Sequence, residues 1–395
     1  ISGQKVYITW GDNDFGGNIC HLVLARLPGA PAGTKGISLF LVPKYLPNDD
    51  GSLGNANSLK VVSLEHKLGI HGSPTCVMQY DKATGWLVGP EQGGMAAMFT
   101  MMNNARLGVG GQGIGIAEAA YQHALAYALD RKQGKTSRPD GTGTIVDHAD
   151  VRRMLMTMKA ETFAARAIAL CCAKAIDMTN ATGQAEWKAR AAFLTPIAKA
   201  FGTDTGMAVA EMGVQVHGGM GFIEETGAAQ YSRDVRVTAI YEGTNGVQAL
   251  DLVGRKLASN GGRAVFSFFG EVDEFINSAD GDADMAPFIE GLTTLKAQLQ
   301  EATTWLMQNG MTDFNNAGAS SHDYLHLFGL TGLAFMWAKM AKIALEKKAA
   351  GDPFYEEKLT TGYYFVDRMV PDGAAHLAKV KTGAKSMMAL PAEAF

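Results

Sequence analysis

Short apolar runs separated by turn-forming residues dominate residues 1–90 of the chain. Each run is rich in β-branched and aromatic residues, which is the pattern of strands. The stretches between them, such as Pro28–Gly36 and Pro47–Asn57, are rich in glycine, proline, asparagine and aspartate. The region therefore predicts a β-sheet or a partial barrel, with strands at Val6–Trp10, Ile19–Arg26, Ile37–Val42, Leu59–Leu64 and Cys76–Tyr80.

From Gly93 onward the apolar positions recur at the spacing of amphipathic helices. This pattern predicts a helical bundle, with helices at Gly93–Lys132, Asp147–Asn180, Glu186–His217 and Asn245–Ala258. It resumes in a second helical region, over Phe288–Met307, Tyr324–Lys348, Tyr355–Met369 and Ala374–Met388. The predicted fold class is α+β and mostly α, with a β-domain over 1–90, a bundle over 91–260 and a further helical domain over 261–395.

Gly108–Gly113 matches the G-x-G-x-x-G phosphate loop of dinucleotide-binding folds. Asp130 also lies near the distance at which such folds place a ribose-binding carboxylate. However, no strand precedes the motif, because the residues on both sides of it have a helical composition. We therefore interpret these glycines as sites of close helix packing.

Tyr324–Ala338 carries no formal charge, so contact with a membrane has to be considered. The segment contains a histidine and is shorter than the about 20 apolar residues that span a bilayer. A buried core helix is therefore favoured, and membrane contact is not expected.

Composition indicates a soluble globular protein, since the 395 residues are 47% hydrophobic and 19% charged. The net charge is −4, and no cluster of lysine and arginine with interleaved aromatic residues occurs, which argues against a nucleic-acid partner. The cysteines form no framework of spaced pairs, so we expect a reducing compartment such as the cytoplasm. Cysteine, histidine and acidic residues show no metal-ligand spacing, and no metal is expected.

The strongest candidate for chemistry is Glu242, within the sequence Tyr-Glu-Gly-Thr-Asn-Gly-Val-Gln over residues 241–248. The β-branched residues of Arg236–Tyr241 predict an extended run. Asn245 and Gln248 have the spacing of a capping box, so the next helix is predicted to start at Asn245. Glu242 would then lie on glycine-flanked backbone that a ligand can approach closely. The alternative interpretation is a first-turn glutamate that complements the helix dipole.

Tyr241–Asn245, preceded by Gln215–Phe222 and by Arg233 with Asp234, resembles the C-terminal signature of the acyl-CoA dehydrogenases. The similarity runs from the first residues to about residue 257, with the motifs in the family's order. It implies that Glu242 removes the α-proton of an acyl-CoA thioester, while the β-hydrogen leaves as hydride to the flavin of FAD. In some family members the base precedes an arginine on another helix. Here an alanine occupies that position, ahead of Arg106, so Glu242 has no competitor.

The resemblance also implies a wider set of binding residues. The flavin-binding residues implied are Tyr7, Ile8, Thr9, Arg131, Gln215, Val216, Gly218, Gly219, Thr244 and Asn245. The acyl-CoA-binding residues implied are Ser73, Asn103, Arg106 and Gly243. Arg131 would reach the FAD diphosphate of a neighbouring subunit, and Gln215–Gly219 would contact FAD across a dimer interface. Taken alone, Thr9 is an ordinary strand residue, Ser73 a turn residue and Arg106 a solvated helix arginine.

Beyond about Asn260 the chain resembles longer bacterial family members of the 3-methylmercaptopropionyl-CoA dehydrogenase type. The resemblance implies a short or medium acyl-CoA substrate, an electron-transferring flavoprotein as acceptor, and a homodimer or homotetramer. Relative to the family, an N-terminal helical domain and the start of the β-domain are absent, so an N-terminal fragment of the same protein is an expected partner. The alternatives are an acyl-CoA oxidase and, from another class, a non-catalytic acyl-CoA-binding or scaffold protein.

Overall fold

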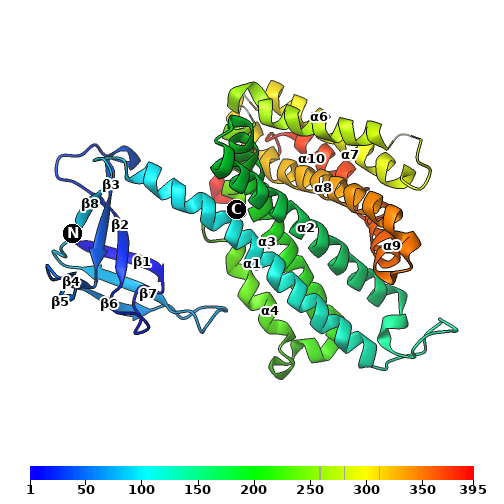
Figure 1. Ribbon diagram of the computed structural model, residues 1–395, viewed down its shortest axis with the longest axis horizontal. Coiled ribbons are helices and arrows are strands. Elements are labelled where there is room, and N and C mark those ends of the chain that lie inside the picture. The colour runs from blue at the N-terminus through cyan, green and yellow to red at the C-terminus, as the bar shows by residue number, and fades with distance from the viewer. Residues whose placement is uncertain (258, 280, 311) are drawn as a thin grey trace. The chain divides into compact units, whose positions relative to one another are not determined.

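The computed structural model describes residues 1–257, 259–279, 281–310 and 312–395. They form two compact units, Ile1–Ala105 and Arg106–Phe395, and the division falls within the long helix α1 (Gly94–Asp130). The strands belong to the first unit, whereas the second unit is helical (Figure 1). The predicted fold class, α+β and mostly α, is confirmed.

Two three-stranded antiparallel sheets and a two-stranded ribbon build the first unit. The strands are β1 (Gly3–Thr9), β2 (Cys20–Arg26), β3 (Ile37–Pro43), β4 (Tyr45–Pro47), β5 (Leu53–Ala56), β6 (Leu59–Leu64), β7 (Thr75–Tyr80) and β8 (Trp86–Val88). The sheets have the orders β1-β7-β6 and β2-β3-β8, and β4 pairs with β5. Side chains of both sheets meet in one core, where Val42 of β3 and Met78 of β7 are fully buried.

The five predicted strands are all present, close to their predicted bounds. The sequence did not predict β4, β5 and β8, which span only three or four residues each. A run of this length is too short to show the alternation by which strands are recognised.

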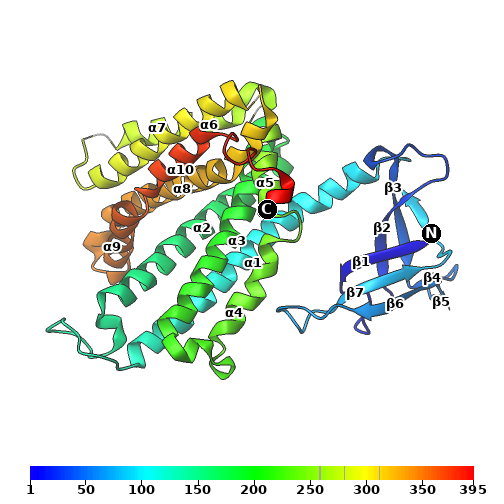
Figure 2. The ribbon, with the colours of Figure 1, turned by 180° about the vertical axis from the view of Figure 1, so that it is seen from behind.

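The second unit is built from α-helices that pack along one another. After α1, they are α2 (Ala149–Thr182), α3 (Ala185–His217), α4 (Ala228–Val235), α5 (Asn245–Asp251), α6 (Arg263–Ser278), α7 (Ala286–Asn309), α8 (Phe314–Lys347), α9 (Pro353–Arg368) and α10 (Asp372–Thr382). Single-turn helices are η1 (Thr34–Gly36), η2 (Ile145–Asp147), η3 (Gly218–Phe222), η4 (Glu224–Thr226), η5 (Arg236–Ala239), the π-turn η6 (Leu252–Lys256), η7 (Ser259–Gly262), η8 (Lys348–Ala350) and η9 (Ala392–Ala394). Figures 1 and 2 both show α2 and α3 side by side.

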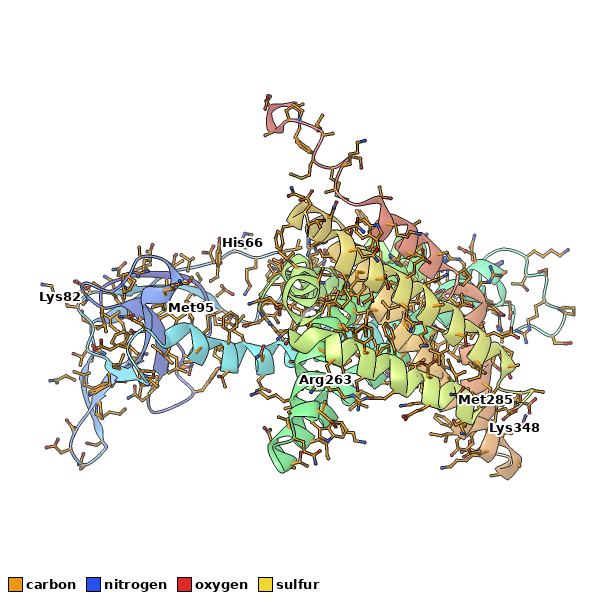
Figure 3. The ribbon with its side chains drawn as sticks, turned by 90° about the horizontal axis from the view of Figure 1, so that it is seen from above. His66, Lys82, Met95, Arg263, Met285 and Lys348 are labelled. Carbon is orange, nitrogen blue, oxygen red and sulfur yellow. The ribbon has the colours of Figure 1, made fainter. Side chains whose placement is uncertain are left out.

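The predicted helices are present with some different ends, since α5 ends at Asp251 and continues as η6, and α10 ends at Thr382. The predicted end at Ala258 lies outside the described residues. Helices α4 and α6 were not predicted from the sequence. In Figure 3, Arg263 marks the start of α6, Met285 directly precedes α7 and Lys348 directly follows α8. Helix α8 starts earlier than predicted, because the carboxylate of Asp313 accepts a 2.9 Å hydrogen bond from Asn315 N and caps the first turn.

One apolar cluster joins α2 and α3 to the helices that follow residue 260. Ile197 of α3 and Phe328 and Trp337 of α8 are almost fully buried within it. Among the described residues, Phe314–Ala350 is the one helical segment with the length and hydropathy of a membrane span, yet 72% of its most apolar stretch is buried inside the protein. This segment is a core helix, as the sequence predicted.

Helices α1 and α3 cross at glycines. A Cβ added at Gly110 would lie 2.6 Å from the carbonyl oxygen of Ala198, and one added at Gly113 would lie 2.5 Å from that of Gly202. No side chain fits at these distances, so the two backbones touch. The glycines of the G-x-G-x-x-G pattern are therefore packing sites, as interpreted from the sequence, and they bring α1 next to the middle of α3.

Two local predictions are wrong. Arg236–Tyr241 is not extended: residues 236–239 form η5, where Thr238 Oγ1 donates a 2.6 Å hydrogen bond to Val235 O, a local bond that competes with extended backbone. Asn245 does not cap α5 either. The cap is Thr244, whose hydroxyl oxygen accepts a hydrogen bond from Val247 N at 3.2 Å.

Candidate active site

Glu242 lies on a strained turn between η5 and α5. Its φ is +56°, in the left-handed region that costs a non-glycine residue about 1–2 kcal/mol. Its Oε2 is buried and has no hydrogen-bond partner among the residues that the structure describes. Strained backbone and a buried polar atom without a partner each need an explanation, and active sites are where both are commonly found.

The turn is fastened on each side of Glu242. The hydroxyl of Tyr241 donates to Gln112 Oε1 on α1, and the side chain of Gln248 donates from Nε2 to Gly243 O at 3.3 Å. Gly243 has φ +89°, and a Cβ added there would lie 2.7 Å from Gln248 Nε2, so the position requires glycine. The carboxylate is thus presented by a backbone with little freedom to move.

Asn245 anchors the turn to α3. Its Oδ1 accepts a 2.8 Å hydrogen bond from Lys199 Nζ, and its Nδ2 donates to Thr203 Oγ1 at 2.9 Å and to Asp204 Oδ1 at 2.7 Å. The amide oxygen and both its hydrogens therefore have partners on one face of α3. The predicted contact between Asn245 and FAD remains a prediction, since these bonds are all internal.

Lys199 of α3 is a buried cation of the site, and its side chain is fully enclosed by the protein. Burial is the main cause that lowers the pKa of Lys199 from 10.5 to about 8, and the nearby charge of Arg106 contributes to this decrease. The carboxylates of Asp204 and Glu242 act in the opposite direction. Lys199 and Glu242 are thus electrostatic neighbours on separate elements.

Arg106 is also buried in this region, with 5% of its surface exposed. Its Nη1 lies 3.6 Å from Oδ2 of Asp251. The other oxygen of Asp251, Oδ1, lies 2.7 Å from Arg255 Nε. A Cβ added at Gly243 would lie 3.7 Å from Arg106 Nη2, so the guanidinium lies close to the turn. Its predicted contact with acyl-CoA remains a prediction.

A second set of predicted residues gathers at the far ends of α1 and α3. The ring of Tyr127 stacks on that of His217 at 4.4 Å, and Arg131 follows Tyr127 by one turn with its side chain exposed. The predicted residues on the α3 side are Gln215, Val216, Gly218 and Gly219, of which only Val216 is buried. His217 is buried, its Nδ1 lies 2.7 Å from Gly213 O, and burial lowers its pKa, which suits a structural role.

This second set is distant from Glu242 within one chain. Tyr241 contacts α1 at Gln112, and the rise from Gln112 to Arg131 along the helix is about 28 Å. The chain therefore gathers the predicted residues of its second unit in two places. One contains Glu242, Gly243, Thr244, Asn245 and Arg106, and the other contains Arg131 and the residues at the end of α3.

The remaining predicted residues belong to the first unit. Strand β1 is an edge strand with a bulge between Lys5 and Ile8, where Tyr7 has φ +58° and is 74% exposed. Thr9 is also exposed and pairs with Thr75 of β7. A bulge of this kind redirects side chains at functional edges.

Two further predicted residues of this unit are Ser73 and Asn103. Ser73 closes a turn, in which its N–H donates to Ile70 O at 3.0 Å and its carbonyl oxygen accepts from Lys67 Nζ. The backbone of Ser73 therefore forms a turn, which was the alternative interpretation of this residue. Its binding to acyl-CoA remains a prediction. Asn103 is exposed on α1.

Three residues around the turn were not predicted from the sequence, namely Lys199, Asp204 and Gln112. Lys199 had a visible signal, because it is a single cation within the apolar run of Phe193–Phe201. A charge at such a position is rarely buried without partners. Asp204 and Gln112 lie on α3 and α1 at ordinary polar positions, and only the fold brings them to the turn.

The chain matches two family models. The model of the acyl-CoA dehydrogenase C-terminal domain covers residues 92–257, and the model described as acetyl-CoA dehydrogenase C-terminal like covers residues 268–391. These matches account for most of the second unit and for the extension beyond residue 260.

Similar proteins agree with this assignment. The chain is 42% identical to the 3-methylmercaptopropionyl-CoA dehydrogenase of Ruegeria pomeroyi, over 98% of this chain and 67% of that protein. It is 35% identical to a butyryl-CoA dehydrogenase of Syntrophomonas wolfei, over 100% of this chain and 68% of that protein. Among solved structures, the acyl-CoA dehydrogenase of Bacillus anthracis complexed with FAD has a TM-score of 0.76 at 21% identity, over 96% of this chain and 63% of that one, and so shares the fold.

The chain thus spans about two thirds of the length of the curated relatives and 63% of the solved structure. Identity of 42% with one curated protein over nearly the whole chain, the matching family models and the shared fold all lead to the same assignment. The chain belongs to the acyl-CoA dehydrogenase family.

Proposed function

We propose that this chain supplies the α-proton base of an FAD-dependent acyl-CoA dehydrogenase, and that Glu242 is that base. The observation that carries the proposal is the buried Oε2 of Glu242, which has no hydrogen-bond partner among the described residues. A carboxylate oxygen that is shielded from water and from donors is suited to accept a proton from carbon. The left-handed backbone of Glu242 supports the same role.

The proposed reaction removes two hydrogens from adjacent carbons of an acyl thioester. Bound FAD supplies the acceptor for the hydride that leaves the β-carbon. Glu242 takes the α-proton, which is weakly acidic, so its carboxylate has to be aimed at the carbon before the reaction begins. The contacts of Tyr241 with Gln112 and of Gln248 with Gly243 restrict the turn for this purpose.

The thioester carbonyl oxygen gains negative charge as the proton leaves. Among the described residues, nothing accepts a hydrogen bond from the backbone N–H of Glu242. We propose that this N–H donates to the carbonyl oxygen, where it would stabilise the developing charge. Gly243 leaves the approach open, because any side chain there would meet Gln248.

The residues of the second set fit a flavin dinucleotide. The Arg131 guanidinium is exposed and can donate two hydrogen bonds to a diphosphate. A Cβ added at Gly218 or Gly219 would meet no atom within 4 Å, so there is open space beside that backbone. At the first set, Thr244 uses its hydroxyl oxygen as a helix cap and still has its hydrogen to donate. We propose that these residues hold FAD with Gln215, Val216 and Asn245. The flavin contacts of Tyr7–Thr9 are a separate proposal for the first unit.

A homo-oligomer accounts for the separation of the two sets. The rise of about 28 Å between Gln112 and Arg131 supports an arrangement in which each chain gives Glu242 to one FAD and Arg131 to the FAD of a partner. The smallest assembly that satisfies this arrangement is a dimer with twofold symmetry.

We propose a short or medium acyl-CoA as substrate, 3-methylmercaptopropionyl-CoA among the candidates. The curated relatives are named for this thioester and for butyryl-CoA, which supports an acyl group of this size. We further propose that an electron-transferring flavoprotein accepts the electrons and that the enzyme is cytoplasmic.

The test is the visible spectrum of the purified protein, with any N-terminal fragment that accompanies it, without oxygen and before and after adding a panel of acyl-CoAs. We expect one thioester to bleach the oxidised flavin band. Glu242→Gln should keep FAD and lose at least about 100-fold in the bleaching rate, because it removes the base and keeps the shape. Glu225→Gln, at an exposed glutamate, is the matched control and should react like the wild type.

Three results would contradict the proposal. Bleaching by Glu242→Gln at the wild-type rate would remove Glu242 from the base role. A protein that binds no FAD, even after FAD is added, would favour the acyl-CoA-binding or scaffold alternative. Rapid reoxidation of the reduced flavin when oxygen is then admitted would identify an acyl-CoA oxidase.

A further inference from the structure

His326 of α8 lies against Asp204, a residue of α3 that holds the Glu242 turn through Asn245. His326 Nε2 of α8 lies 3.1 Å from Asp204 Oδ2. The other oxygen of Asp204, Oδ1, accepts the 2.7 Å hydrogen bond from Asn245 Nδ2. Asn245 begins α5, directly after the turn. A series of contacts therefore runs from α8 through one carboxylate to the segment that presents Glu242.

Residues of α8 and α10 surround the ring of His326. The ring of His376 stacks on it at 5.6 Å with an interplanar angle of 17°, and the ring of His322 lies 4.4 Å away. His376 Nδ1 in turn lies 2.8 Å from Asp323 Oδ1. His326 Nε2 is buried and lies close to Asp204 without hydrogen-bond geometry.

The position of His326 is fixed by close packing of α8 on α3. A Cβ added at Gly329, one turn after His326, would overlap the ring of Phe201. The same ring lies 5.7 Å from that of His326. Because the α8 backbone touches a ring of α3, the backbone at His326 cannot move away from Asp204 without opening this packing.

We propose that Asp204 and His326 are positioning residues for Glu242, through which the helices beyond residue 260 hold the turn of the candidate base. This inference rests on the proposed function, because it assigns the two residues to the same reaction. Neither residue needs to touch the substrate. Asp204 orients the amide of Asn245 so that its oxygen faces Lys199, and His326 keeps Asp204 in place.

The experiment compares His326→Phe with His326→Gln and with a control on the same helix. His326→Phe keeps a ring and removes both nitrogens, so the rate of flavin reduction at saturating acyl-CoA should fall about 10- to 100-fold, with KM unchanged. His326→Gln should restore most of the rate, because it returns a polar nitrogen to the position beside Asp204. Tyr324→Phe loses a buried 2.9 Å hydrogen bond to Thr303 without touching Asp204, and it should keep the wild-type rate.

A second measurement does not depend on activity. Amide hydrogen exchange of the peptide that covers residues 241–248 should be faster in His326→Phe than in the wild type, and unchanged in Tyr324→Phe. If the wild type fails to reduce flavin with any thioester, the proposed function fails and exchange alone decides the positioning claim. The inference would be overturned if this peptide exchanged in His326→Phe at the same rate as in the wild type. It would also be overturned if His326→Phe lost no more of the flavin-reduction rate than Tyr324→Phe.

Discussion

The buried ammonium of Lys199 makes the stability of the second unit depend on pH in a predictable direction. The side chain is fully enclosed, and burial lowers its pKa from 10.5 to about 8. In the unfolded chain the lysine regains a pKa of about 10.4. Below pH 8 the lysine is protonated in both states, and its burial as a cation opposes folding.

Between pH 8 and about 10.4 the unfolded chain still holds the proton and the folded protein has released it. The unfolded state then binds more protons, so the free energy of unfolding rises with pH over this window. Each pKa unit corresponds to about 1.4 kcal/mol, so the full rise contributed by Lys199 is about 3 kcal/mol. The gain is complete only above the pKa of the unfolded lysine.

The assay is urea-induced unfolding of the wild type and of Lys199→Met at pH 7, 8, 9 and 10. Methionine has a similar length and no charge, so the difference in unfolding free energy between the two proteins should shift by about 2–3 kcal/mol in favour of the wild type from pH 7 to 10. Lys188→Met, which removes an exposed lysine of α3, should show no such shift. A constant difference between wild type and Lys199→Met across this range would refute the burial of a perturbed lysine at the site.

Two further predictions concern the helix crossing and the second set of residues. Gly113→Ala should destabilise the protein by more than about 2 kcal/mol in urea unfolding, because its Cβ would lie 2.5 Å from Gly202 O. Gly115→Ala, two residues along α1 where an added Cβ meets nothing within 4 Å, should instead stabilise it by about 0.5–1 kcal/mol. Equal effects of the two substitutions would contradict the close crossing. Arg131→Ala should weaken FAD binding about tenfold or more in a fluorescence titration, because a charge-assisted pair of hydrogen bonds is lost. Unchanged FAD affinity would exclude Arg131 from the cofactor site.

Regular patterns made most of the fold predictable. Long helices such as α2 and α3 carry the apolar spacing over many turns, and strands such as β3 carry apolar runs bounded by turn residues. Helix α6 had the same signal, since its buried Val265, Phe269 and Val272 recur at helical spacing. Helix α6 was therefore predictable, whereas β8 and the other three- or four-residue strands carry no comparable pattern.

The sequence predicted that the turn with Glu242 is a candidate site, but it did not predict the conformation of the backbone that leads to it. The residues of 241–245 identified the family, but β-branched residues at 236–241 favoured an extended run where η5 forms. Burial of Val235 and Thr238 against the bundle overrides that local preference, because propensity is weaker than tertiary packing. The partners of Asn245 on α3 lie more than 40 residues away along the chain, and no spacing rule connects them.

Thr244, and not the predicted Asn245, caps α5, and this explains how so short a turn is held on both sides. Thr244 caps α5, so the amide of Asn245 is free to face Lys199 and Asp204. If Asn245 were the cap, its oxygen would bond an N–H of α5, and the Lys199 ammonium would be buried without that acceptor, at a cost of several kcal/mol. Thr244 secures the turn to α5 and Asn245 secures it to α3. Between these fixed points Glu242 is left in the left-handed conformation, with a carboxylate oxygen that no residue of the described chain satisfies.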